Sequence, residues 1–367
     1  MSVPMSAPRS HRPRTSGALL RLVVAFSAVL GVAAGLPASA AAATTSGTLP
    51  RLSVTSDYVT GISSGGYMAT QLQVAYSSRF AAAGIFSAGP YHCAQNSVAI
   101  ALEACTSPPT VPDNLSASIA YTDRAAQAGL IDPTANLARQ RTWFFHGTQD
   151  TVVAPSVADD LAAYYHHYGV PLTYRNTDPA GHAWISPLGP NPCGVNQLPY
   201  LNNCGFDAEQ QMLTTMFGSV HPPNLATPQG AVQAFSQNPY ATAPQPGAGD
   251  VTRTGAAAIG MGQTGYVYVP NGCAKGQKCR VIVSLHGCLQ TADQIGTTFV
   301  TDSYLNQYAD TNKLVILYPQ ATPDTTFGNP KGCWDWWGYL GANDGNYATR
   351  NGPQMTTVMN MITALGG

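Results

Sequence analysis

One segment of the chain has the residue types and spacing of a reactive serine. Residues 61–65 read Gly-Ile-Ser-Ser-Gly and match G-x-S-x-G. The flanking pattern predicts a strand ending near Thr60 and a helix over 65–76, which is the context of a nucleophile elbow. There the glycines permit a sharp turn that presents Ser63 above the edge of a sheet. The alternatives are an ordinary glycine-rich turn and attack by Ser64, which lies outside the central position of the motif.

A serine hydroxyl needs a base, and the base needs an acid that orients it. The order Ser, Asp, His of α/β-hydrolases directs the search downstream of Ser63. Asp150 follows a predicted strand over 142–146, and His182 follows a short predicted strand over 172–175. Both residues therefore fall at the sheet edge that carries Ser63. We expect His182 Nε2 to take the serine proton, while Asp150 orients Nδ1–H and stabilises the imidazolium.

The oxyanion of an ester hydrolysis needs two backbone N–H donors. One is expected from Ser64, the residue after the nucleophile, and the other from a loop after a different strand. A predicted strand over 281–285 leads into His286-Gly287-Cys288, where the amides of Gly287 and Cys288 are candidates and Cys288 is favoured. A rival hypothesis makes Cys288 a thiol nucleophile with His286, but an exported chain favours a disulfide there.

The first forty residues have the layout of a secretory signal peptide. Arginines precede an apolar run over residues 22–36, and Ala38-Ser39-Ala40 supplies the small residues of a cleavage site. We expect removal of residues 1–40, although cleavage after Ala43 fits equally well. The alternative is a membrane anchor, for which the run is short. We therefore expect a secreted, extracellular protein with no membrane contact after cleavage.

The composition excludes several classes of protein. Of the 367 residues, 44% are hydrophobic and 10% charged, which excludes a disordered chain. The leader holds four of the 17 basic residues and no acid, so residues 41–367 carry 13 basic and 18 acidic residues. This balance shows no basic footprint for nucleic acid. We expect a monomer with no nucleic-acid partner, and the sparse charge suits an uncharged substrate.

All eight cysteines lie beyond the leader, and an even count in an exported chain implies disulfides. Zinc is the competing interpretation, but the spacings lack paired C-x-x-C units, so no metal is expected. Close neighbours suggest three pairs and leave a fourth across a longer loop: Cys93–Cys105, Cys193–Cys204, Cys273–Cys279 and Cys288–Cys333.

Strand and helix signals alternate along the chain, which predicts an α/β fold with a mostly parallel sheet and helices on both faces. We expect one catalytic domain over 41–367, with a proline-rich connection at 219–250. The predicted strands, besides those already given, lie at 82–87, 265–269 and 314–318. The predicted helices, besides the first, lie at 115–128, 156–168, 207–217, 297–309 and 355–365.

The order of the motifs is unusual, because the oxyanion strand normally precedes the nucleophile. Here Cys288 follows Ser63 by 225 residues, and 22 residues separate Ala40 from Ser63. We infer a circular permutation in which the missing early strands are the C-terminal ones and residues 219–250 cross the old termini. Such rewiring is feasible because chain termini usually lie close together at the surface.

Taken together, these motifs make the chain resemble extracellular poly(3-hydroxybutyrate) depolymerases of the single-domain, circularly permuted type. The resemblance covers essentially all of residues 41–367 and implies an α/β-hydrolase fold, a serine esterase without a cofactor, and four disulfides. It implies the triad Ser63, Asp150 and His182, with the amides of Ser64 and Cys288 as oxyanion donors. Its marks are Gly61 to Ala69, Gly89-Pro90-Tyr91, Leu285 to Gln290, Tyr308 to Asn312, Tyr318-Pro319-Gln320 and Gly332 to Trp336.

We expect no separate C-terminal polymer-binding domain after the catalytic part, and we expect adsorption of solid or oligomeric polyester to use the catalytic domain's own surface. Four aromatic residues crowd one loop, namely Trp334, Trp336, Trp337 and Tyr339. An exposed aromatic cluster can bind an apolar polymer. We expect Trp334 above all to line the cleft. The alternative is a buried aromatic core beside the Cys288–Cys333 bridge.

Two other functions fit parts of this pattern. A feruloyl or acetylxylan esterase on the same scaffold would use identical chemistry with a different acyl pocket. A non-catalytic polymer-binding protein would keep the fold without turnover, and the complete Ser63–Asp150–His182 set argues against it.

Overall fold

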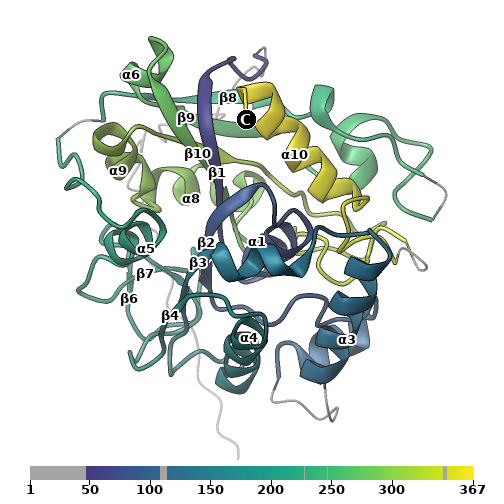
Figure 1. Cartoon of the computed structure of the whole chain (residues 1–367). Helices are drawn as coiled ribbons and strands as arrows, with labels where there is room; N and C mark the ends of the chain where they lie inside the picture. The colour runs from purple at the N-terminus through teal and green to yellow at the C-terminus, as the bar shows by residue number, and fades with distance from the viewer. Residues whose placement is uncertain (1–46, 108–113, 227, 246, 342–344) are drawn as a thin grey trace, which may run out of the picture. The chain divides into compact units, whose positions relative to one another are not determined.

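The computed structural model describes residues 47–107, 114–226, 228–245, 247–341 and 345–367, so the expected signal peptide lies outside the described residues. Eight strands within these ranges form one sheet, in the order β4-β3-β2-β1-β10-β11-β9-β8 (Figure 1). In that order the strands are Leu172–Arg175, Arg141–Phe145, Phe80–Phe86, Ser53–Ile62, Lys278–Leu285, Leu314–Tyr318, Thr264–Val269 and Ala231–Ser236.

The six strands from β4 to β11 run parallel, and β9 and β8 add an antiparallel edge. Every residue of β11 is buried, which its continuous apolar run predicts for a strand covered on both faces. In β10, Val281 and Val283 pack into one core while Ile282 packs into the other, as the two-residue period of a strand requires. The prediction of a mostly parallel sheet is confirmed.

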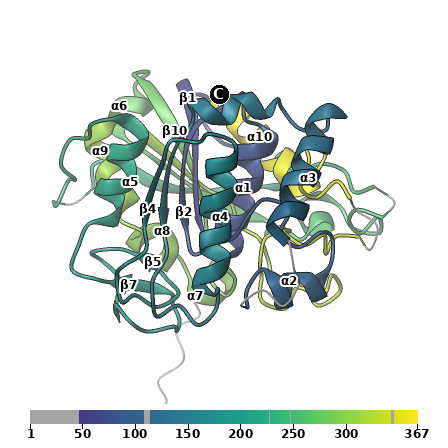
Figure 2. The ribbon, with the colours of Figure 1, turned by 60° about the horizontal axis from the view of Figure 1, so that its bottom comes forward.

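Two layers of helices cover the sheet, and Figure 2 shows α1 and α4 on one side of the strands and α5 and α9 on the other. The core on that side contains residues of the helices Ser64–Ala75 (α1), Asn114–Gln127 (α3), Pro155–His167 (α4) and Pro353–Leu365 (α10). The core on the other side contains residues of Ala208–Phe217 (α5), Thr298–Asp302 (α8) and Leu305–Asn312 (α9). The predicted helices on both faces are thus confirmed.

The remaining elements are short. A small three-stranded sheet packs beside α5, and six further short helical segments of the described ranges lie in loops, two of them next to strand β10. None of the helices in the described ranges is long and apolar enough to cross a membrane. These elements are β5 (Trp184–Ile185), β6 (Asn191–Pro192), β7 (Leu201–Asn203), α2 (Val98–Ala104), α6 (Asn271–Ala274), α7 (Ala292–Ile295), and 3₁₀ helices at Thr134–Arg139, Asn238–Tyr240 and Gly255–Ile259.

The strand order agrees with the inferred permutation. Followed from β8, the chain adds β9, skips one place to β10, returns to fill that place with β11, and resumes beyond β10 with β1 to β4. The end of α10 meets the start of β1, where the Leu52 N–H donates to the Leu365 carbonyl at 2.8 Å. Figure 1 shows the end of α10 beside this strand. Helix α10 therefore stands where the crossover between β11 and β1 would run.

Two details differ from the prediction. The helix expected over 297–309 is two helices, because Tyr304 adopts a left-handed conformation (φ 63°) between α8 and α9. The carbonyls of Asp302 and Ser303, at the break, accept hydrogen bonds from the Ser186 hydroxyl and the Trp184 indole instead of continuing a helix. The connection at 219–250 also contains an edge strand, β8, which its proline-rich composition did not predict.

A carboxyl group lies inside the second core. Glu209 on α5 is fully buried, and its Oε1 accepts a hydrogen bond from Trp184 Nε1 at 2.6 Å. Its Oε2 has no partner among the described residues. Burial, helped by the nearby charge of Asp207, raises the pKa of Glu209 well above its ordinary value. Burial in the folded protein therefore favours the protonated form of this group.

We predict that Glu209 makes the folded state less stable as the pH rises. Its folded-state pKa is raised, so its contribution to stability is complete below the pKa of the unfolded carboxyl and is lost as the pH rises toward the folded value. Between the two pKa values the loss is about 1.4 kcal/mol per pH unit. Glu209→Gln should flatten this dependence. Denaturant unfolding at acidic, neutral and alkaline pH measures it, and parallel pH profiles for the two proteins would contradict the prediction.

Candidate active site

Ser63 occupies a tight turn between β1 and α1. Its backbone has a positive φ of 55°, which is unusual for a residue other than glycine. Its N–H donates to the Phe86 carbonyl, and its own carbonyl accepts the Tyr67 N–H. A Cβ atom on Gly61 would lie 2.2 Å from the Gly65 carbonyl oxygen, and one on Gly65 would lie 2.3 Å from the Leu285 carbonyl oxygen. The two glycines of the motif are therefore required by close backbone approach, and Ser63 is left half-buried.

Asp150 and His182 meet where the sequence analysis placed them, beyond the carboxyl ends of β3 and β4. His182 Nδ1 lies 2.8 Å from Asp150 Oδ2. The other carboxylate oxygen accepts the N–H groups of Val152 and Val153, each at 2.8 Å. The His182 backbone is held in turn, because its N–H donates to Asn196 Oδ1 at 2.7 Å. The pair is nearly closed to solvent, with 5% of the His182 side chain and none of the Asp150 side chain exposed.

Asp150 is held as a carboxylate. Burial by itself would raise its pKa, but the charge and hydrogen bond of His182, with lesser contributions from His146 and the Val153 N–H, bring the pKa below its ordinary value. His146 lies behind this pair, with Nδ1 3.9 Å from Asp150 Oδ2. Burial lowers the pKa of His146, although the charge of Asp150 opposes this.

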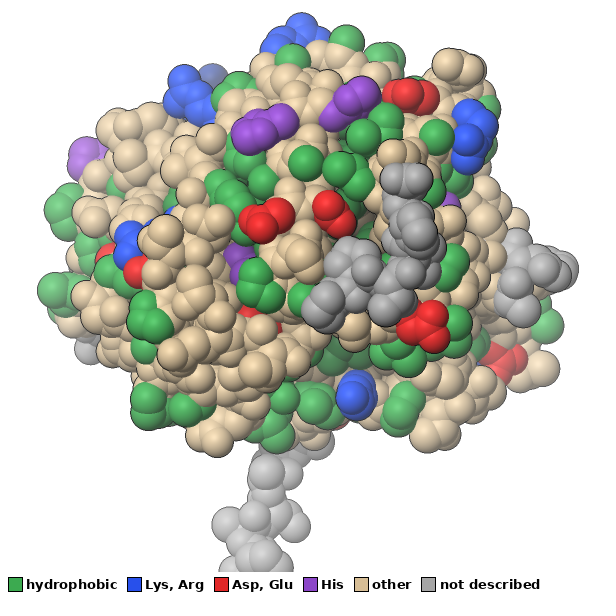
Figure 3. Space-filling view, turned by 90° about the horizontal axis from the view of Figure 1, so that it is seen from below, with side chains coloured by type: hydrophobic (Ala, Val, Ile, Leu, Met, Phe, Trp, Pro, Cys, Tyr) green, Lys and Arg blue, Asp and Glu red, His purple; other side chains and the backbone are tan. Residues whose placement is uncertain are grey.

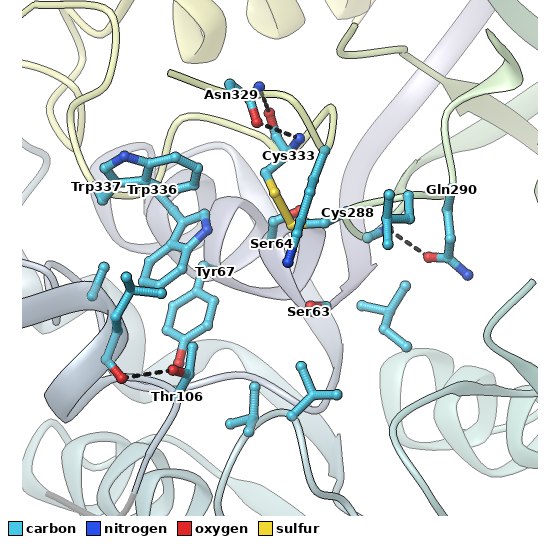
Figure 4. Close-up of a pocket in the computed structure, with 18 of the residues that line it drawn as sticks. Ser63, Ser64, Tyr67, Thr106, Cys288, Gln290, Asn329, Cys333, Trp336 and Trp337 are labelled. Carbon is cyan, nitrogen blue, oxygen red and sulfur yellow. Dashed lines mark hydrogen bonds between the residues drawn. A yellow bond between two sulfur atoms is a disulfide. The ribbon is translucent and has the colours of Figure 1, made fainter. Parts of the chain in front are cut away.

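One cavity of approximately 430 Å³ joins the candidate residues. Ser63, Ser64, His182 and Cys288 all line it. Figure 4 shows Ser63, Ser64 and Cys288 together, with Tyr67 and Trp336 toward one end and Gln290 toward the other. Most of the wall is apolar, a feature typical of small-molecule and lipid-like substrate sites. Its apolar side chains include Val98, Ala101, Leu102, Val152, Val153, Leu289, Trp336 and Trp337.

The two expected oxyanion donors have no hydrogen-bond partner among the residues that the structure describes. Ser64 is the first residue of α1, where backbone N–H groups have no partner within the helix. The Gly287 N–H donates to Gln290 Oε1 at 2.6 Å and is therefore occupied. The Cys288 N–H has no hydrogen-bond partner in the described part of the chain. The loop is close to the serine, since a Cβ on Gly287 would lie 3.2 Å from Ser63 Cβ.

The four expected disulfides are confirmed: Cys93–Cys105, Cys193–Cys204, Cys273–Cys279 and Cys288–Cys333. The bond between Cys288 and Cys333 excludes the rival hypothesis of a Cys288 thiol nucleophile. His286 is not placed to act as its base either, because its Nδ1 lies 2.7 Å from the Gly287 carbonyl and its Nε2 accepts the Ala321 N–H. Burial lowers the pKa of this ring to about 4.

The aromatic loop divides into two pairs. Trp336 and Trp337 line the cavity, and Trp336 stacks on Tyr67 with ring centroids 4.2 Å apart. The expectation that Trp334 lines the cleft is wrong, because its side chain is fully buried and Nε1 donates to the His286 carbonyl at 3.0 Å. Tyr339 is also outside the cavity wall, since its hydroxyl turns inward and donates to the Cys333 carbonyl at 3.0 Å.

Several residues of the cavity wall were not predicted from the sequence. The clearest examples are Val98 and Leu102 on α2. They are 57% and 61% exposed although both are apolar and line the cavity. Ser97 before this apolar run could have indicated the start of a helix, since its side chain caps α2 by accepting the Ile100 N–H, but it does not show which side faces a cavity. Figure 3 views the sheet edge beyond the strand ends, where hydrophobic side chains are scattered and charged ones are few.

This sheet, with a serine at the strand-to-helix turn and a buried histidine–aspartate pair beside it, defines an α/β-hydrolase. Residues 264–362 match the family model described as "Esterase PHB depolymerase". A poly(3-hydroxybutyrate) depolymerase of Delftia acidovorans is 37% identical over 324 residues, which is 86% of this chain and 60% of that protein. A polyhydroxybutyrate depolymerase of Talaromyces funiculosus is 34% identical over 322 residues, or 83% of this chain and 87% of that protein. The chain belongs to the PHB depolymerase family, a family of ester hydrolases.

Solved structures agree with this assignment. A PHB depolymerase complexed with an R3HB trimer has 33% sequence identity and a TM-score of 0.75, covering 87% of this chain and 98% of that one. The crystal structure of PHB depolymerase from Penicillium funiculosum has the same identity and coverage, with a TM-score of 0.74. The α/β-hydrolase prediction is thereby confirmed. The chain spans about 60% of the length of the Delftia relative.

We predict that Gly65→Ala destabilises the fold. The added Cβ would meet the carbonyl oxygens of Leu285 and His286 at 2.3 and 2.4 Å, so the backbone of α1 or of the segment after β10 must move. Overpacking of this kind costs about 1–3 kcal/mol. Thermal unfolding measures the loss, with Gly345→Ala as the control because a Cβ there meets nothing within 4 Å. Equal unfolding midpoints for the two variants would contradict the prediction.

Proposed function

We propose that this chain is a serine esterase that hydrolyses the ester bonds of poly(3-hydroxybutyrate), releasing 3-hydroxybutyrate oligomers and monomer. One observation carries the proposal: Ser63 and the Asp150-bound His182 line one apolar cavity beside a free backbone N–H, in a chain of the PHB depolymerase family. The depolymerase solved with an R3HB trimer supports the choice of ester.

The proposed reaction assigns each group one task. The hydrogen bond to Asp150 places the proton of the neutral His182 ring on Nδ1, so that Nε2 of this neutral ring can accept the proton of Ser63. The Ser63 oxygen attacks the ester carbonyl, and the amides of Ser64 and Cys288 bind the oxyanion. His182 then protonates the leaving alcohol as the acyl-enzyme forms. Water, activated by the same ring, hydrolyses the acyl-enzyme and restores Ser63.

The cavity wall supports an apolar, uncharged acyl chain. Trp336 and Trp337 offer aromatic faces, and Leu289 and Val153 offer aliphatic ones. A polyester of short methyl-branched units matches such a wall, because its surface is apolar except for ester oxygens. We infer that solid polymer adsorbs around this opening, where Val98 and Leu102 are exposed.

The proposal includes export. A signal peptide over residues 1–40 would carry the chain to an oxidising compartment, and the four disulfides fit that destination. Export would also bring the enzyme to a polymer too large to enter a cell.

We predict that the protein without residues 1–40 clears a suspension of poly(3-hydroxybutyrate) and that Ser63→Ala does not. Loss of a serine nucleophile lowers kcat by about 10⁶-fold. Turbidity and the appearance of soluble 3-hydroxybutyrate oligomers measure the reaction. Ser53→Ala, at the far end of the same strand, is the matched control.

Three outcomes are informative. Clearing by the wild type and by Ser53→Ala alone supports the proposal. Ser63-dependent cleavage of a p-nitrophenyl ester without clearing moves the substrate to a feruloyl or acetylated polysaccharide. If Ser63→Ala and the wild type behave equally in every assay, the enzymatic proposal is wrong and a non-catalytic polymer-binding protein is favoured.

We predict that Asp150→Asn lowers kcat by about 10⁴-fold with a much smaller change in KM. An amide in place of the carboxylate favours the wrong imidazole tautomer and no longer stabilises the imidazolium. Steady-state kinetics on a soluble p-nitrophenyl ester measures both constants. If kcat stays within a few-fold of the wild type, Asp150 is not the acid that orients His182.

A further inference from the structure

The loop that follows β10 has an unusual set of backbone hydrogen bonds. In the peptide group between His286 and Gly287, the carbonyl accepts Trp334 Nε1–H at 3.0 Å and the N–H donates to Gln290 Oε1 at 2.6 Å. In the next peptide group the Gly287 carbonyl lies 2.7 Å from His286 Nδ1. Three of these four polar groups are thus held by buried side chains. The fourth, the Cys288 N–H, is the one left without a partner in the described residues.

The histidine hydrogen bond has a defined direction. The Ala321 N–H donates to His286 Nε2 at 3.1 Å, so the ring proton must be on Nδ1, which donates to the Gly287 carbonyl. A trans peptide is planar, with its C=O and N–H pointing in opposite directions. Holding the Gly287 carbonyl on one side therefore sets the direction of the Cys288 N–H on the other.

Gln290 connects this loop to a second wall of the site. Its side chain is 1% exposed, and its Nε2 donates to the carbonyls of Pro199 and Tyr200 at 2.8 and 3.2 Å. Tyr200 lines the cavity and stands edge-on to the His182 ring, with centroids 6.0 Å apart. One buried amide therefore holds the oxyanion loop through its oxygen and the segment beside the base through its nitrogen. Figure 4 shows the hydrogen bond that Gln290 makes at the edge of the cavity.

We propose that Gln290 is a positioning residue that presets the oxyanion donor. By holding the Gly287 N–H it fixes the loop from which the Cys288 N–H points at the cavity, and through Pro199 and Tyr200 it ties that loop to the His182 side. The inference rests on the proposed function, because it needs Cys288 as an oxyanion donor. Donors of this kind are effective when they are already aimed before charge develops.

The test compares Gln290→Met and Gln290→Glu with the wild type. Gln294→Met is the matched control, because Gln294 lies one turn further on and bonds only to Thr291 among the described residues. Kinetics on p-nitrophenyl butyrate gives kcat and KM. Titration with an organophosphorus fluoride that labels the active serine counts working sites. Inhibition by an alkylboronic acid, which forms a tetrahedral adduct with serine, reports on the oxyanion donors.

We predict that Gln290→Met lowers kcat per titrated site by about tenfold to a hundredfold, in the range expected for a misplaced catalytic group. KM should change little, because ground-state binding uses the apolar wall. Affinity for the boronic acid should fall in parallel with kcat/KM. Gln294→Met should match the wild type in all three measurements.

Gln290→Glu adds a readout that a purely structural role would not move. An ionised glutamate can still accept the Gly287 N–H but faces the carbonyls of Pro199 and Tyr200 without a proton to donate. A protonated glutamate supplies that donor. The ratio of variant to wild-type kcat should therefore rise as the pH falls.

Two results overturn the inference. One is unchanged kcat per titrated site in Gln290→Met, even where fewer sites titrate. The other is a fall in kcat with unchanged boronic acid affinity. Failure of the proposed function is distinguishable, because then Ser63→Ala would retain the wild-type hydrolysis of p-nitrophenyl butyrate.

Discussion

The pairing of β1 with β10 is the constraint on which the site depends. In this parallel pair Gly61 lies opposite Leu285, so both strands end together and the residues just beyond them meet. Ser63 follows one strand end and Cys288 the other, although 225 residues separate them in sequence. Helix α1 is then packed so closely that Gly65 touches the Leu285 carbonyl. A shift of register by one residue would turn the core side chains outward and separate the serine from the loop.

Two buried carboxyl groups show how the surroundings of an acid shift its pKa. Asp150 receives three hydrogen bonds, two of them from backbone N–H groups, and its pKa falls below the ordinary value even though burial opposes this. Glu209 receives one from Trp184, and burial raises its pKa. Asp150 makes its polar contacts beside the cavity, whereas Glu209 lies among the apolar side chains of the second core. The same chemical group is therefore favoured in its ionised form at one place in this fold and in its protonated form at another.

Most of what could be predicted followed from the order of the motifs along the chain and from the residue types at the turns. Strands with continuous apolar runs, the G-x-S-x-G turn and the spacing of the cysteines gave the fold class and the four disulfides, and placed Asp150 and His182 at one edge. The local sequence could not show whether an aromatic side chain lines the cavity or is buried in the core. Trp334 packs in the core, where its indole N–H donates to a backbone carbonyl 48 residues away. Likewise, the break at Tyr304 and the edge strand β8 depend on partners distant in sequence: Trp184 and Ser186 in one case, β9 in the other.

The Cys288–Cys333 bond lies at an instructive place. Cys288 would bind substrate through its backbone, while its sulfur joins the loop to the segment that carries the cavity tryptophans. Reduction would release one wall of the site from another without altering Ser63, Asp150 or His182. Under the proposed export, the covalent brace between these two walls would form only after the chain has left a reducing compartment, so oxidation would be the last step in assembling the site.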